Sequence, residues 1–129
     1  MTRMTRAILL LSTLLLALPA SFAKDPVEGS FLHHVYFWLA EPNSPAARKE
    51  FLAELNKMRA IPGIRYSFIG TPAADARDVV DNSYTFYWLA TFDDKKAWKV
   101  YDQHPIHDAF RTKSALWKKV QVYDTLRVK

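Results

Sequence analysis

Histidine is the residue type in this chain best suited to carry chemistry, and the four histidines form two pairs. His33 and His34 are adjacent in an apolar segment, whereas His104 and His107 flank a proline. Tyr101, His104 and His107 follow one another at intervals of three residues. Their side chains would therefore lie roughly along one side of a continuous helix. A histidine in a pocket can exchange protons near neutral pH, and a nearby tyrosine can polarise a carbonyl group. The spacing therefore indicates general acid–base chemistry as one interpretation.

Two other interpretations stay open. A His-x-x-His pair with a strand histidine can bind Zn²⁺, but no carboxylate or cysteine stands at a strong ligand spacing, and we expect no metal. In the structural interpretation, His104 caps the helix that begins at Pro105, and His107 donates one hydrogen bond inward.

Several familiar catalytic motifs are absent. The chain has no G-x-S-x-G, no cysteine and three glycines, so it lacks a nucleophile elbow, a thiolate and a phosphate-binding loop. These absences argue against the familiar hydrolases, nucleotide-binding enzymes and kinases, and we expect no cofactor.

Residues 1–23 have the three parts of a secretory signal peptide. Arg3 and Arg6 form a basic start, residues 7–18 are almost entirely apolar, and Ala23 ends a small-residue cleavage pattern. A single membrane anchor is the alternative, but spanning a bilayer takes about 20 apolar residues. We therefore expect cleavage near Ala23, export to the periplasm or the medium, and no stable membrane anchor afterwards.

The mature chain is mildly basic. Removing Arg3 and Arg6 lowers Lys+Arg from 18 to 16 against 13 acidic residues, a net charge of +3. The basic residues are scattered, so the sequence does not favour nucleic acid as a partner. Without cysteine, the exported domain must be stable through packing alone.

The elements that must position the histidines alternate in type. Residues 24–30 are expected to be a flexible lead-in, and Ser44, Asp93 or Asp94, and Pro105 mark helix starts. The second of the two late helical pieces has Phe110, Ala115, Leu116 and Trp117 as its apolar set. The predicted strands are 31–39, 64–70, 83–92 and 120–128, and the first helix is 45–60. This order predicts an α+β, ferredoxin-like fold, a four-stranded antiparallel sheet with helices on one face.

The strands are apolar or aromatic on both faces. In the first strand, His33 and Phe37 share one face while Tyr36 and Trp38 share the other. In the third strand, one face has Tyr84, Phe86 and Trp88, and the other has Tyr87 and Leu89. Helices can cover only one face, and a second copy of the sheet is the simplest cover for the other. We therefore expect a homodimer through the face that contains Tyr36, Trp38, Tyr87 and Leu89.

Four segments resemble the stress-responsive α/β-barrel domain family, Dabb. The most specific is 101–110, which is similar to the family's Tyr-x-x-His-Pro-x-His-x-x-Phe signature. The others are 33–39, 61–64 and 84–93, and the resemblance places the domain at residues 31–126. It implies a ferredoxin-like fold that dimerises through its sheets into a β-barrel.

The resemblance also implies a site. Most members have no assigned activity, some plant members respond to stress, and one plant member is a polyketide cyclase with a pocket between sheet and helices. The resemblance to this cyclase implies that Tyr101 corresponds to its important tyrosine and His107 to its catalytic histidine. It also implies that His33 corresponds to a histidine in the cyclase pocket. Phe86 replaces a further histidine, and Trp88 would fill pocket volume, which argues against cyclase activity. The expected ligand-binding residues are His33, Phe37, Phe86, Trp88, Tyr101, His104 and His107.

Three functions follow from these expectations. The first is an exported, dimeric module that binds a small hydrophobic or aromatic molecule, with a role in stress that only the family resemblance suggests. The second is an enzyme of the lyase or cyclase type, in which His107 acts as the base and Tyr101 orients a carbonyl group. The third is haem or metal binding, by analogy with related barrel folds.

Overall fold

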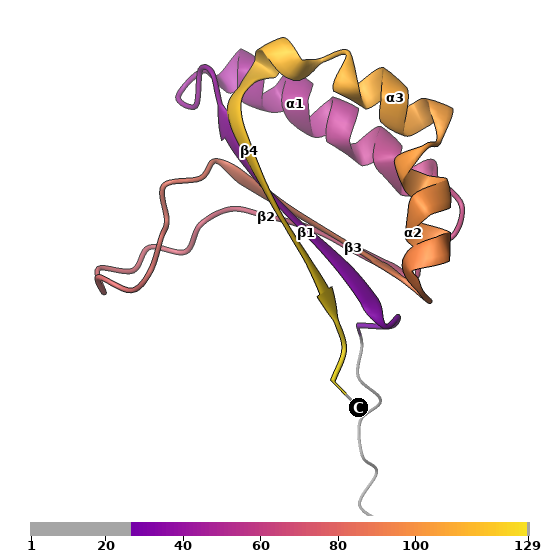
Figure 1. Cartoon of the computed structure of the whole chain (residues 1–129). Coiled ribbons are helices and arrows are strands. Elements are labelled where there is room, and N and C mark those ends of the chain that lie inside the picture. Colours follow the sequence, from indigo (N-terminus) through magenta and orange to yellow (C-terminus); the bar gives the residue numbers. More distant parts are fainter. Residues whose placement is uncertain (1–26, 129) are drawn as a thin grey trace, which may run out of the picture.

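The computed structural model describes residues 27–128, so the predicted signal peptide lies outside the described residues. Four antiparallel strands form one sheet in the order β2-β3-β1-β4, and the helices all cover one face of it (Figure 1). This arrangement confirms the predicted ferredoxin-like fold class. The elements are β1 (Phe31–Leu39), α1 (Pro45–Lys57), η1 (Met58–Ala60), β2 (Tyr66–Gly70), β3 (Phe86–Phe92), α2 (Lys95–Asp102), α3 (Pro105–Arg111), η2 (Ser114–Leu116) and β4 (Trp117–Leu126).

Each α-helix is preceded by a residue whose side chain accepts a hydrogen bond from the first turn. Ser44 accepts from the Ala47 amide at 3.2 Å, and Asp94 accepts from the Ala97 amide at 2.8 Å. Such caps satisfy backbone donors that the helix itself leaves free. The sequence predicted both helix starts, and the structure confirms them.

Residues 28–30 of the predicted lead-in are fastened to the end of β3. The Ser30 amide donates to the Phe92 carbonyl at 2.9 Å, and the Thr91 hydroxyl donates to the Glu28 carbonyl. Gly29 has a φ of +98°, and a Cβ there would lie 2.7 Å from the Phe92 carbonyl oxygen. Only glycine fits this close approach, so the position sets how the chain enters β1.

Two predicted placements are wrong. Trp117 belongs to β4 rather than to a helix, because it pairs with Leu39 in the sheet. Tyr84 precedes β3 and packs against Tyr36 on the face opposite to the one predicted, with ring centroids 5.0 Å apart. β3 begins only at Phe86, so the alternation of side chains between the two faces of the strand does not extend back to Tyr84.

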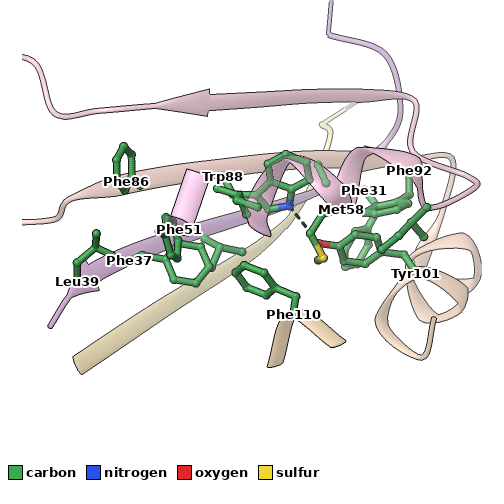
Figure 2. Packing of buried hydrophobic residues seen from close by; sticks show 14 residues of the cluster. Phe31, Phe37, Leu39, Phe51, Met58, Phe86, Trp88, Phe92, Tyr101 and Phe110 are labelled. Atoms are coloured by element: carbon green, nitrogen blue, oxygen red, sulfur yellow. Dashed lines mark hydrogen bonds between the residues drawn. The ribbon is translucent and has the colours of Figure 1, made fainter. Parts of the chain in front are cut away.

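The sheet has an inner face toward the helices and an outer face away from them. The inner face and α1 enclose a core rich in aromatic rings (Figure 2). Phe51 of α1 is fully buried and stacks on Phe86, with ring centroids 5.4 Å apart. The outer face has Tyr36 and Tyr87 in contact, at 4.9 Å between centroids. In the part of the chain that the structure describes, no helix covers this outer face.

Candidate functional site

A cavity of about 300 Å³ lies between the inner face of the sheet and α2 and α3. Its walls come from β1, β3, β4 and the helices, and they are mostly apolar. Five of the seven predicted ligand-binding residues line it, which are His33, Phe37, Trp88, Tyr101 and His107. The structure thus brings together in one cavity residues that are far apart in the sequence.

The break between α2 and α3 positions the two central side chains. Tyr101 lies in the last turn of α2, and His107 lies in the first turn of α3, which Pro105 opens. A proline cannot continue a helix without losing a hydrogen bond, so the chain turns there. The turn brings the rings of Tyr101 and His107 to 4.9 Å between centroids.

His33 is held by an acidic residue that the sequence analysis did not single out. Its Nδ1 lies 2.6 Å from Oδ1 of Asp124, because β1 and β4 pair these residues directly. An ionised carboxylate can only accept, so Nδ1 of His33 is the donor. The Nε2 atom of a neutral His33 then has the lone pair, which makes this nitrogen a proton acceptor.

Asp124 carries a signal that could have identified it. Residues alternate along β4, and Val120, Val122, Asp124 and Leu126 share one face. An aspartate at the inner-face position of an otherwise apolar set is unusual. The antiparallel register places it beside His33, which the sequence did select.

Tyr101 is buried and hydrogen-bonded to Trp88. Each residue is only 1% exposed, and Nε1 of Trp88 donates to the Tyr101 hydroxyl at 3.0 Å. Burial raises the pKa of Tyr101 well above its ordinary value, so its hydroxyl stays neutral throughout the physiological range.

His107 is neutral near physiological pH. Burial lowers its pKa from 6.5 to about 4, and the nearby Arg111 guanidinium acts in the same direction. Its Nδ1 atom is buried, and no described residue forms a hydrogen bond with it. The inward hydrogen bond predicted for this side chain is therefore not found among residues 27–128. Nε1 of Trp98, another cavity-lining residue, is in the same situation.

Two predicted ligand-binding residues lie outside the cavity lining. His104 caps α3, where its Nδ1 accepts from the Ile106 amide at 3.2 Å, as the structural interpretation predicted. Phe86 packs against Phe51, and the Arg48 guanidinium lies 4.7 Å above its ring centroid. Both side chains therefore support the fold around the cavity.

His34 lies on the outer face, away from the cavity. Its Nδ1 is 2.8 Å from the Tyr87 hydroxyl, and its Nε2 is 3.3 Å from the Thr125 hydroxyl. Burial lowers the pKa of His34, with His33 as a further cause. Burial also raises the pKa of Tyr87 to about 12. The side chains of the adjacent residues His33 and His34 thus lie on opposite faces of the sheet.

Residues 31–126 match the family described as the stress responsive A/B barrel domain, Dabb. The chain belongs to this family. The match covers the whole sheet and all the helices, so the Dabb domain contains the cavity and every residue that lines it.

Solved structures with the same fold include a Dabb family protein from Mesorhizobium loti, with 25% identity and a TM-score of 0.66. The likeness covers 79% of this chain and 100% of that one. A dimeric ferredoxin-like protein of unknown function from Thermobifida fusca has 19% identity, a TM-score of 0.60, and coverage of 78% and 93%. The hydroxynitrile lyase from Passiflora edulis has 16% identity, a TM-score of 0.67, and coverage of 78% and 95%. No curated protein gives a significant match.

The described residues contain neither a metal-binding cluster nor a membrane-spanning helix. Within residues 27–128, histidines and carboxylates nowhere gather in a group of three or more that could hold a metal ion. No helix in the same part of the chain has the length and apolar character needed to cross a membrane.

Proposed function

We propose that this Dabb protein is exported, forms a homodimer, and binds a small aromatic or apolar molecule in the cavity. The observation that carries the proposal is the composition of the cavity wall. Apolar side chains form most of it, and His33, Tyr101 and His107 supply a few polar groups close together. Small-molecule sites commonly have this composition, in which apolar surface gives affinity and a few polar groups fix orientation.

The outer face of the sheet supports the dimer. Tyr36, Trp38 and Tyr87 are only half-buried there, although they form a connected set of aromatic contacts with Tyr84. A contiguous aromatic surface of this kind is typical of protein–protein contacts. The related structure from Thermobifida fusca is described as dimeric, which favours a second copy as the cover.

The leader sequence supports export. Its basic start, apolar run and small-residue cleavage pattern are the features of a cleavable signal. The proposal predicts that protein recovered outside the cytoplasm begins at Lys24, which intact-mass measurement would test. A mass that retains residues 1–23 would contradict it.

A second candidate function is acid–base catalysis on a carbonyl compound, and the pairing of His33 with Asp124 favours it. The Asp124 carboxylate would stabilise the imidazolium that forms when Nε2 of His33 takes a proton. The Tyr101 hydroxyl would stabilise the negative charge that develops on the carbonyl oxygen. His107 has a pKa of about 4, which makes it a poor proton acceptor at neutral pH, and the contact with Asp124 favours His33 for that role.

Proton exchange would test the second candidate. In D₂O, the enzyme would remove a proton from the carbon next to the carbonyl of acetophenone and return a deuteron, which NMR detects. His33→Gln should abolish the exchange, whereas His104→Asn should retain it because His104 lies outside the cavity lining. Equal exchange rates for both variants and the wild type would reject this candidate.

Bound molecules would test the leading function. The protein is purified after export, its small molecules are extracted, and untargeted mass spectrometry compares it with two variants. Val122→Trp should block the cavity that Val122 lines, whereas Val79→Trp changes a loop residue that is 88% exposed. We expect one or more apolar compounds in the wild type and in Val79→Trp but not in Val122→Trp. The same compounds in all three proteins would contradict a cavity ligand.

A further inference from the structure

The hydrogen bond between Trp88 and Tyr101 has a fixed direction. An indole nitrogen carries a proton and no available lone pair, so Nε1 of Trp88 can only donate. The hydroxyl oxygen of Tyr101, 3.0 Å away, is therefore the acceptor, as the dashed line in Figure 2 shows. This bond occupies a lone pair of the Tyr101 oxygen and directs the hydroxyl proton elsewhere.

The hydroxyl proton of Tyr101 needs an acceptor. Tyr101 is 1% exposed, so bulk water does not reach the group freely. Among the residues that the structure describes, none accepts a hydrogen bond from this hydroxyl. A buried donor without an acceptor is unfavourable, and native proteins avoid it unless a ligand or water fills the place. Tyr101 lines the cavity, so a cavity ligand is well placed to supply the acceptor.

The charges around the cavity disfavour an anionic ligand. The lining contains one guanidinium, Arg111, and two carboxylates, Asp102 and Asp124. Arg111 is already bound to Asp102 at 2.6 Å and to Asp108 at 2.7 Å. No uncommitted cation therefore remains in the described lining to balance a carboxylate or phosphate brought in from water.

The hydrogen bond from Trp88 to Tyr101 favours a ligand with an acceptor atom, and the charges around the cavity favour a neutral one. We infer that Trp88 is a positioning residue, which fixes the Tyr101 hydroxyl as a hydrogen-bond donor and restricts the cavity to neutral ligands that carry an acceptor oxygen. This inference rests on the proposed ligand-binding function and goes beyond it, because it names the ligand chemistry. A neutral aromatic ketone or aldehyde has the required features, namely a flat apolar body and a carbonyl oxygen.

Three probes of similar shape test the ligand class. Acetophenone has a carbonyl group, α-methylstyrene replaces the oxygen with a methylene group, and benzoate replaces the ketone with a carboxylate. Titration of the wild type should show acetophenone binding about tenfold more tightly than α-methylstyrene, which corresponds to one hydrogen bond. Benzoate should bind more weakly than either. Equal affinity for acetophenone and α-methylstyrene, or preferred binding of benzoate, would overturn the inference alone. Failure of all three probes to bind would overturn the proposed function as well.

A double-mutant cycle tests whether Trp88 acts through Tyr101. Tyr101→Phe should remove the preference for acetophenone over α-methylstyrene, and Trp88→Phe should reduce it. In the Tyr101→Phe background, Trp88→Phe should have no further effect on this ratio, because the hydroxyl that it orients is gone. An equal effect in both backgrounds would show that Trp88 only shapes the cavity. Trp38→Phe is the control, since its indole lies on the outer face of the sheet, outside the cavity lining, and the change should leave the preference intact.

A spectroscopic readout separates positioning from a loss of packing. The carbonyl stretch of bound acetophenone should shift to lower frequency in the wild type, less so in Trp88→Phe, and not at all in Tyr101→Phe. If Trp88→Phe fails to fold, benzothienylalanine at position 88 keeps the bicyclic ring and lacks the N–H donor. An unchanged carbonyl stretch and an unchanged preference in that protein would overturn the role of Trp88.

Discussion

The burial of His107 makes the stability of the fold sensitive to acid. Folding lowers the pKa of this histidine from 6.5 to about 4. Between these two values the unfolded chain binds more protons than the folded protein, so the free energy of unfolding falls as the pH decreases. Above pH 6.5, protonation of His107 does not reduce the free energy of unfolding, and the reduction grows as the pH approaches 4.

The magnitude follows from the two pKa values. Linkage gives a loss of about 2.5 kcal/mol between about pH 7.5 and about pH 4.5 for a shift of this size. The side chain is only partly buried, and solvent screening reduces the expected loss to about 1.5 kcal/mol.

Urea unfolding at the two pH values measures this loss in the wild type and in His107→Gln. The wild type should lose about 1.5 kcal/mol more than the variant on acidification. All samples need one protein concentration, because the proposed dimerisation would also stabilise the fold. His104→Asn is the control, since Asn keeps the helix cap and leaves His107 in place. An equal acid-induced loss in the wild type and His107→Gln would refute the reasoning.

Three further predictions concern the dimer, the His33 contact and the core. Trp38→Asp should yield monomers in sedimentation velocity, whereas Lys99→Asp on the exposed side of α2 should not; a Trp38→Asp protein that remains dimeric would show that the outer face is not the interface. Asp124→Ala should lower the free energy of unfolding by about 1 kcal/mol, a small loss because its side chain is 38% exposed, and an unchanged urea midpoint would contradict the contact with His33. Phe51→Ala should cost about 3–5 kcal/mol because the ring is fully buried, while Val79→Ala should change stability by less than about 0.5 kcal/mol, and similar thermal midpoints for the two variants would contradict the core assignment.

The sequence predicted the fold well wherever local chemistry and hydrophobic pattern agree. The nine residues of β1 alternate between buried and half-buried, as their apolar and aromatic pattern indicated. Ser44 and Asp94 cap helices because their short polar side chains reach the first-turn amides. These features depend on residues that are close together in the chain, so the sequence alone was sufficient.

The misplaced residues depend on contacts between distant segments. Trp117 follows an apolar pattern that the sequence analysis assigned to a helix, but it pairs with Leu39 and belongs to β4. In the sequence, Tyr84 continues the alternating pattern of β3, yet it precedes the strand and packs on Tyr36. In both cases a partner from β1 decides the outcome.

The candidate site could be predicted only in part, because some of its contacts are local in the sequence and others join distant segments. The signature around Tyr101 and His107 is local, and the structure places both side chains at the cavity. Asp124 stands beside His33 only through the register of β4 against β1. The bond from Trp88 to Tyr101 likewise joins a strand to a helix, so neither contact follows from spacing in the sequence.

Histidine-selective NMR during titration with acetophenone tests the central claim of a ligand-binding cavity most directly. His33 and His107 line the cavity, His104 caps α3 outside its lining, and His34 lies on the outer face. The imidazole resonances of His33 and His107 should shift in a saturable manner, while those of His104 and His34 remain in place. Saturable shifts confined to His104 or His34, or no saturable shift at any histidine, would contradict binding in this cavity.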